Sequence, residues 1–182
     1  MCGALERGLQ ICLLRKGGIV EADRGGFELR YSRFLLFPTY EHEHTLLLQD
    51  SFKHLVNEPR DDSHELTLVC EVTDVIVTPG FDALRNASGQ FVWNDAFLRK
   101  RLDYKPHLPV YAILTRTYRL PSPIFIPDRP SYAGCKSWVH LTEEIAIERA
   151  TPVLNDAEFE TRRDTLLSIL QVDRTQRDLV LR

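Results

Sequence analysis

The chain has 182 residues, which is long enough for one domain with a sizeable hydrophobic core. Apolar residues make up 43% and charged residues 27%, which are ordinary values for a soluble globular protein. The formal net charge of −3 and the pI near 6.1 argue against a protein held on nucleic acid by bulk positive charge, although a local basic patch remains compatible with them.

Cysteine spacing and hydropathy indicate the cellular compartment. The four cysteines, at positions 2, 12, 70 and 135, include no close pair, so we expect reduced thiols rather than a disulfide framework. The longest apolar runs are far shorter than the ~20 residues of a membrane span, and no basic-then-apolar signal peptide opens the chain. We therefore expect a soluble, cytoplasmic protein without a membrane segment.

The first third of the chain predicts strands that end in polar, turning segments. Residues 4–7 predict a helical turn that Gly8 closes, and residues 9–14 predict a buried strand. Residues 27–37 are predicted to form one or two strands. We expect the runs 11–14 and 34–37 to be neighbouring antiparallel strands joined by a Gly-rich connection. Helical spacing of apolar residues then predicts a helix over 40–56.

The remaining elements mix strands with helices and show no regular βαβ repeat. The sequence predicts strands over 66–77 and 110–120 and a strand at the end of 134–141. It predicts helices over 81–84, 91–102 and 158–170 and proline-rich loop structure over 121–130. We therefore expect an α+β fold, with a curled, mostly antiparallel sheet or a small β-barrel flanked by helices. Residues 1–170 are expected to form one globular domain, and 171–182 a polar tail.

An Arg-Lys-Gly-Gly sequence directly follows the first predicted strand. Arg15 can bind phosphate through two hydrogen bonds, Lys16 adds a second cation, and Gly17 and Gly18 let an anion approach backbone N–H groups. The spacing is not that of a Walker phosphate loop. The simpler interpretation is a hairpin turn that needs positive φ, with incidental charges.

Residues 40–44 bring two imidazoles and two carboxylates into five positions. Glu41 or His42 is a candidate general acid or base, because imidazole titrates near neutrality, and Tyr40 is a candidate ligand contact. In the predicted helix, His42 and His44 lie about 200° apart and cannot both ligate one ion. We therefore predict no metal site and no cofactor.

The segment Gly-Cys-Lys-Ser-Trp at 134–138 collects several reactive groups. Lys136, Ser137 and Trp138 are candidates to line a ligand pocket. A nucleophilic Cys135 would need a base such as His140 or His42. The structural alternative is the start of a strand, with the indole in the core and the polar groups in a turn.

The densest basic cluster is Arg99-Lys100-Arg101, with Lys105 nearby and Trp93 and Tyr104 as aromatic neighbours. Cations interleaved with aromatic rings suit phosphate contacts combined with base stacking. The alternative is a solvated face of the helix.

Three blocks of this sequence, RKGGI at 15–19, FLLFPTYEHE at 34–43 and GCKSWVHL at 134–141, are similar to signature blocks of the domain of unknown function 1802 family. That family consists of small bacterial proteins without an established activity, and the resemblance covers about residues 4–160. Glu43 stands where the family more often has glutamine. At the level of the fold, the order of elements also resembles PUA and ASCH barrels, which bind RNA or modified bases and include some hydrolases.

Three functions are compatible with these patterns. The first is a module that binds RNA, DNA or a nucleotide through an Arg/Lys/Gly phosphate turn. The second is a small hydrolase, a phosphoesterase or nuclease, with His42 or Glu41 as general base and Arg15 stabilising charge. The third is a structural or interaction protein without catalysis. The carboxylate and lysine pattern of the PD-(D/E)XK nucleases is absent, which disfavours a Mg²⁺ nuclease of that class.

Overall fold

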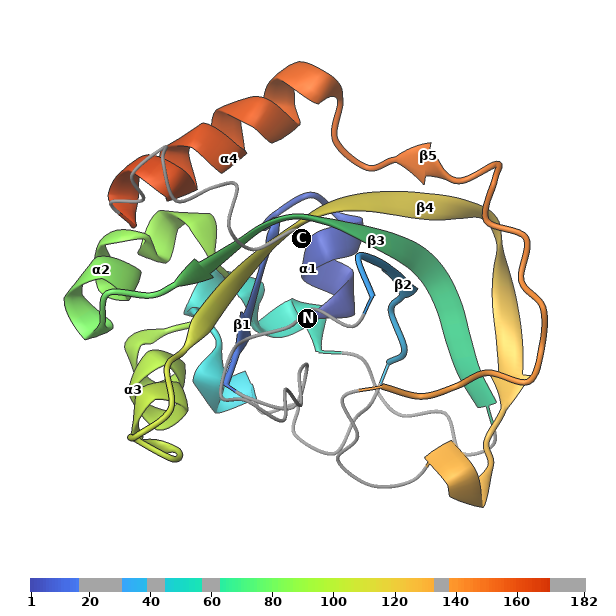
Figure 1. Ribbon diagram of the computed structural model, residues 1–182, viewed down its shortest axis with the longest axis horizontal. Coiled ribbons are helices and arrows are strands. Elements are labelled where there is room, and N and C mark those ends of the chain that lie inside the picture. Colours follow the sequence, from blue (N-terminus) through green and yellow to red (C-terminus); the bar gives the residue numbers. More distant parts are fainter. Residues whose placement is uncertain (17–30, 39–44, 57–62, 133–137, 171–182) are drawn as a thin grey trace.

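The computed structural model describes residues 1–16, 31–38, 45–56, 63–132 and 138–170 (Figure 1). Its helices are α1 (Cys2–Glu6), α2 (Phe81–Asn86), α3 (Asp95–Asp103) and α4 (Asp156–Ile169), with 3₁₀ turns at Thr45–Leu47, Asp50–Leu55, Ser88–Gln90 and Pro130–Tyr132. Its strands are β1 (Cys12–Arg15), β2 (Arg33–Leu35), β3 (Ser63–Val77), β4 (Tyr111–Pro127) and β5 (Thr151–Pro152). No helix in these ranges is long and apolar enough to cross a membrane.

The strands form one antiparallel sheet in the order β1-β4-β3-β2, and β5 pairs with β4. Cys12 pairs with Leu114 and Phe34 with Cys70, so two strands, β4 and β3, lie between β1 and β2. The prediction that these two strands are neighbours is therefore wrong. Their pairing sites on β4 and β3 are supplied by a long central hairpin that the local pattern of the first 40 residues cannot reveal.

The sheet is strongly curled into a half-barrel, as the sweep of β3 and β4 shows (Figure 1). Register shifts between Leu66 and Leu68 and between Val72 and Asp74 interrupt the β3–β4 pairing. Such irregularities bend a strand and increase its twist. The predicted α+β class with a curled antiparallel sheet and flanking helices is therefore confirmed.

β4 is longer than predicted, because it continues through the proline-rich segment that was expected to be a loop. Up to Arg119, β4 pairs with β3 on one side and with β1 or β5 on the other. After Arg119, where the prolines at 121, 123 and 127 lie, β3 is the one described strand that pairs with β4. A proline lacks the N–H that a second neighbour would require, so it is tolerated on such an edge.

Two helix predictions also need correction. In the described part of 40–56, the chain forms 3₁₀ turns instead of an α-helix. The helix predicted over 91–102 begins only at Asp95, because Trp93 bridges to Leu48 and the Gln49 side chain donates to the Phe91 and Trp93 carbonyls, which holds the preceding residues extended. The described residues 138–141 do not form the predicted strand. The helices predicted near 81–84 and 158–170 and the strands predicted over 66–77 and 110–120 are confirmed.

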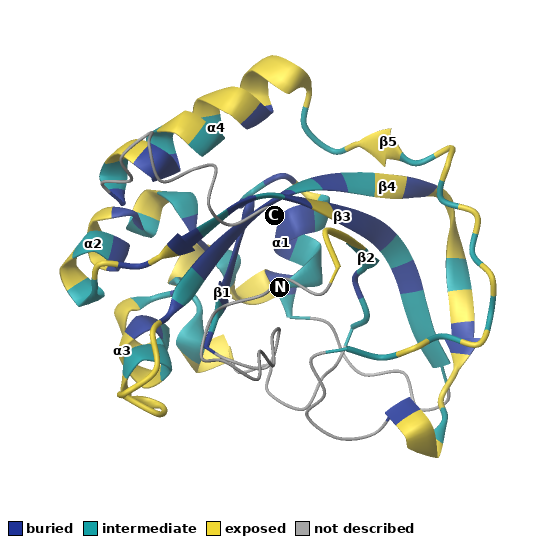
Figure 2. Ribbon diagram, viewed as in Figure 1, coloured by how far each residue is buried: buried dark blue, intermediate teal, exposed yellow. Residues whose placement is uncertain are grey.

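Buried residues run along the central strands β3 and β4 and occur in each helix (Figure 2). Ala112 and Leu114 of β4 belong to one core cluster and Ile113 to another, so both faces of this strand are buried there. The largest cluster joins α2, α3 and α4 to one end of the sheet, around fully buried Leu84, Leu98 and Leu166. A second cluster lies under α1 and contains Leu5, Leu13 and Cys70. Helices α2, α3 and α4 therefore pack on one end of the half-barrel, where β1 ends and β4 begins, whereas Leu5 of α1 belongs to the second cluster.

Candidate functional site

Arg15 and Lys16 lie at the end of β1, beside the beginning of β4. The apolar residues before them are buried, and Arg15 pairs with Tyr111, the first residue of β4. Lys16 is only 7% exposed, and its Nζ donates to the Leu102 carbonyl oxygen at 2.5 Å. That carbonyl belongs to the last turn of α3, where backbone acceptors lack helical partners. Lys16 therefore ties the end of β1 to the end of α3.

α3 carries Arg101 toward the same place. The Asn94 side chain caps the helix by accepting from the Phe97 N–H at 3.1 Å, and Leu98 is fully buried. Arg101 follows Phe97 by four residues and Leu98 by three, so it shares their inward face. It is half-buried, with its guanidinium carbon 5.3 Å from the centre of the Phe97 ring. Arg101 does not project outward with its neighbours, as a purely solvated charge run would.

Arg15, Lys16 and Arg101 form a group of cations, which we call the β1–α3 cluster. Burial lowers the pKa of Arg15, and the charge of Arg101 lowers it further. Burial also lowers the pKa of Lys16. The charge of Asp103 acts in the opposite direction and raises this pKa, and the charge of Arg101 lowers it further. Burial lowers the pKa of Arg101, with Tyr104 acting in the opposite direction. The bond from Lys16 to the carbonyl of Leu102, the residue after Arg101, brings the end of β1 against the end of α3, although Lys16 and Leu102 are 86 residues apart in sequence.

The β1–α3 cluster has little local compensation. Within the described ranges, neither Arg15 nor Arg101 forms an ion pair, and the Arg101 Nε is buried without a hydrogen-bond acceptor. Asp103 is the acidic group that acts on Lys16. The cluster therefore presents an excess of positive charge with unused donors at a half-buried position.

Arg99 lies elsewhere on α3. Its guanidinium carbon is 4.0 Å from the centre of the Phe81 ring, on the side of α2. Its predicted role in phosphate binding stays a prediction, and it provides a natural comparison for Arg101.

Trp138 belongs to a different group of side chains. Its indole meets the ring of Phe34 edge-on, with centroids 5.3 Å apart, and that of Tyr31 at 5.1 Å. The described parts of the blocks at 34–43 and 134–141 are thus brought together at β2, which no spacing in the sequence could indicate. The other predicted site residues lie outside the described residues: Gly17, Gly18, Tyr40, Glu41, His42, Lys136 and Ser137.

A histidine–aspartate pair that the sequence analysis missed joins the far ends of β3 and β4. The His64 Nε2 lies 3.0 Å from Asp128 Oδ1, and its Nδ1 lies 3.2 Å from the Pro38 carbonyl oxygen. The ring also packs on Phe37 at 4.3 Å between centroids. Because both ring nitrogens are engaged, neither is free to act as a general base. His64 therefore links the segment after β2 to the open end of the β3–β4 pair, where β3 begins and β4 ends.

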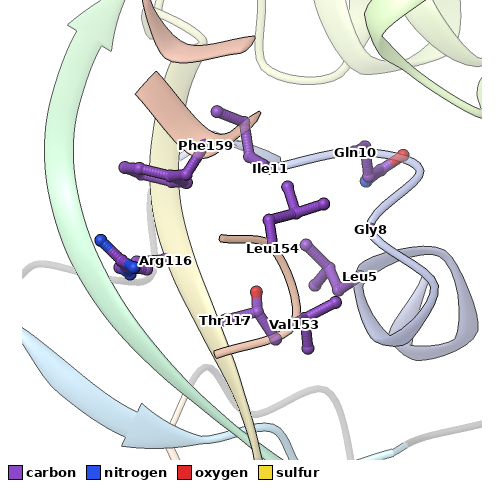
Figure 3. Close-up of a pocket in the computed structure, with 9 residues that line it drawn as sticks. All are labelled: Leu5, Gly8, Gln10, Ile11, Arg116, Thr117, Val153, Leu154 and Phe159. Carbon is purple, nitrogen blue, oxygen red and sulfur yellow. The ribbon is translucent and has the colours of Figure 1, made fainter. Parts of the chain in front are cut away.

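A small cavity lies between α1, β4 and the segment that leads into α4 (Figure 3). Its volume is about 10 Å³, which is room for about one water molecule. Ligand pockets for drug-sized molecules are far larger, at roughly 300–1,000 Å³. The cavity is lined by Leu5, Gly8, Gln10, Ile11, Arg116, Thr117, Val153, Leu154 and Phe159. It cannot hold a nucleotide, so the β1–α3 cluster at the surface is the stronger candidate site.

Comparisons with known proteins give a family and no activity. No curated protein and no solved structure matches the chain, so the similarity to PUA and ASCH barrels is not confirmed. A family model described as a domain of unknown function (DUF1802) matches residues 1–165. Since this match covers most of the 182 residues, the chain belongs to the DUF1802 family.

Proposed function

We propose that this protein binds nucleic acid or a nucleotide and that Arg15, Lys16 and Arg101 contact its phosphate groups. The observation that carries the proposal is that the end of β1, with Arg15 and Lys16, is bonded to the end of α3, with Arg101. The lowered pKa values of the three cations agree with this arrangement. Arg15 and Arg101 are the residues best suited to bidentate phosphate contacts, and Lys16 supplies a further charge.

The energetics of the cluster support an anionic ligand. Bringing like charges together at a half-buried position is unfavourable, and burial and mutual repulsion both act against the charged form of Arg15. A bound phosphate would reverse this repulsion and accept hydrogen bonds from the unused guanidinium donors. Binding residues commonly have such locally unfavourable arrangements in the free protein.

The salt dependence of binding tests the proposal. Fluorescence anisotropy would measure the affinity for labelled single-stranded RNA, single-stranded DNA and duplex DNA. Three phosphate contacts on a single strand predict a slope of about −2 in log affinity against log salt concentration. A fourfold increase in salt would then weaken binding about 20-fold. Absence of binding to every strand at the lower salt would refute the proposal.

A pair of arginine variants on one helix sharpens the test. Arg101→Gln removes one charge from the cluster, so we expect weaker binding and a slope that is smaller in magnitude by about 0.7. Arg99→Gln removes the same charge two residues away, over Phe81, and we expect it to leave the slope unchanged.

Thermal unfolding of the same variants separates a ligand-binding role from a structural one. Because Arg101 repels Arg15 and Lys16, Arg101→Gln should keep or raise the melting temperature of the free protein while it weakens binding. A lower melting temperature with unchanged affinity would instead identify Arg101 as a structural residue.

A further inference from the structure

An exposed tyrosine stands at the edge of the β1–α3 cluster. Tyr104 directly follows α3, and 54% of its surface is exposed. Its N–H donates to the Lys100 carbonyl at 3.2 Å, which fixes the point where the chain leaves the helix. Tyr104 also lies close enough to Arg101 to influence the pKa of that residue. An exposed aromatic ring therefore stands at the end of α3, three residues after Arg101 and two after the Leu102 carbonyl that binds Lys16.

The backbone after this tyrosine has an unusual conformation. Lys105 has a φ of 47°, which places a residue with a side chain in the left-handed region that normally favours glycine. Its carbonyl accepts from the Leu108 N–H at 2.9 Å and closes a turn, and its Nζ lies 5.4 Å from the centre of the Tyr104 ring. Strained residues of this kind persist where the surroundings hold them, often at binding sites. Here the strained residue directly follows Tyr104 and begins a turn that Leu108 closes.

The aromatic rings next to Tyr104 on α3 have structural roles. Trp93 is buried and stacks on Phe97 with centroids 4.7 Å apart and planes 9° apart. Trp93 is thus a core side chain, and the half-buried Phe97 ring is already contacted by Trp93 and by Arg101. Of the aromatic residues that the sequence places beside the basic run, Tyr104 is thus the one whose ring is available at the surface.

We propose that the ligand is a single-stranded nucleic acid and that one of its bases stacks on Tyr104 while the β1–α3 cluster holds an adjacent phosphate. This inference rests on the proposed function and adds the class of ligand to it. In a duplex the bases stack on one another and their faces are covered, so an exposed ring beside phosphate-binding cations suits an unpaired strand. Inorganic phosphate would engage the cluster without the ring.

A comparison of strands with and without bases tests the stacking contact. Anisotropy would be measured for a labelled oligouridylate and for a strand of equal length and charge that carries abasic sites. Stacking of one base predicts that Tyr104→Ala weakens binding of the oligouridylate about 5- to 150-fold, whereas Tyr104→Phe retains it. The abasic strand should bind the wild-type protein more weakly and should bind Tyr104→Ala no more weakly than wild type.

Phe125→Ala provides a matched control, because Phe125 is also 54% exposed but lies near the other end of β4. We expect this variant to bind as wild type does. Unchanged binding in Tyr104→Ala together with weakened binding in Arg101→Gln would overturn the stacking proposal and leave phosphate binding standing. Equal affinity of wild type for duplex and single strands would also overturn it. If wild type binds no strand, both proposals fail.

Discussion

The buried ion pair that fastens α4 to the sheet allows a quantitative prediction. Arg163 Nε and Nη2 donate to the two carboxylate oxygens of Asp74 at 2.6 and 2.9 Å, and the Asp74 side chain is only 7% exposed. Arg163→Met would leave this carboxylate buried without its partner. Removal of one member of a buried pair costs about 3–5 kcal/mol. For a chain of this size, the melting temperature should fall by about 6–20 °C.

The same arginine supplies an internal control. Its Nη1 also contacts Glu160 at 3.2 Å, but the Glu160 side chain is 53% exposed. Glu160→Gln should therefore cost about 0.5 kcal/mol or less.

A second variant tests the cause of the loss. Adding Asp74→Asn to Arg163→Met removes the uncompensated charge, so the double variant should lose less stability than the single one. Urea unfolding at neutral pH would measure all these variants. Loss of under about 1 kcal/mol in Arg163→Met, or a double variant that is no more stable than the single one, would refute the reasoning.

Three further predictions concern other parts of the fold. Gly8 has a φ of +63°, and an added Cβ would lie 2.6 Å from a Leu154 methyl carbon. Gly8→Ala should therefore lower the free energy of unfolding by at least about 1 kcal/mol and shift the urea midpoint down, and an unchanged midpoint would contradict this. Burial raises the pKa of Cys70 to about 12, so iodoacetamide at pH 8 should label this thiol only after unfolding, as peptide mapping would show. The hydrogen bond from His64 lowers the pKa of Asp128, so its contribution to stability is present above the ordinary carboxyl pKa of about 3.9 and is lost as the pH falls through the lower folded value. The stability difference between wild type and Asp128→Asn should therefore shrink in urea titrations from pH 5 to pH 2.5, and a difference independent of pH would argue against that ionic contact.

Helices and strands were predictable where the hydrophobic pattern of a single segment is enough to identify the element. The alternation of buried residues through 66–77 identifies β3, and the apolar face of residues 158–170 identifies α4. The partners of β1 and β2 were not predictable, because pairing with Leu114 and Cys70 depends on contacts distant in sequence. Prolines misled the prediction for the end of β4, since local propensity does not reveal which edge of a strand is unpaired.

The candidate site was predictable as two separate pieces. Arg15 with Lys16 and Arg101 each stood out from local composition, but their convergence depends on the pairing of β1 with β4 and on the bond from Lys16 to the end of α3. Arg101 follows the buried Leu98 by three residues, so helical spacing places it on the inward face. Treating residues 99–101 as one outward charge run ignores this spacing. The His64–Asp128 pair has no motif, because its members belong to the two ends of a long hairpin.

The pairing of β1 with β4 also has a consequence for synthesis of the chain. Leu13 pairs with Ile113, so about 100 residues must be added after β1 before its partner exists. At translation rates of about 5–20 residues per second, this takes roughly 5–20 s. Throughout that interval the apolar strand has an open edge, which is a template for association with other chains. The nascent protein should therefore depend on chaperone protection most strongly before residue 114 has left the ribosome.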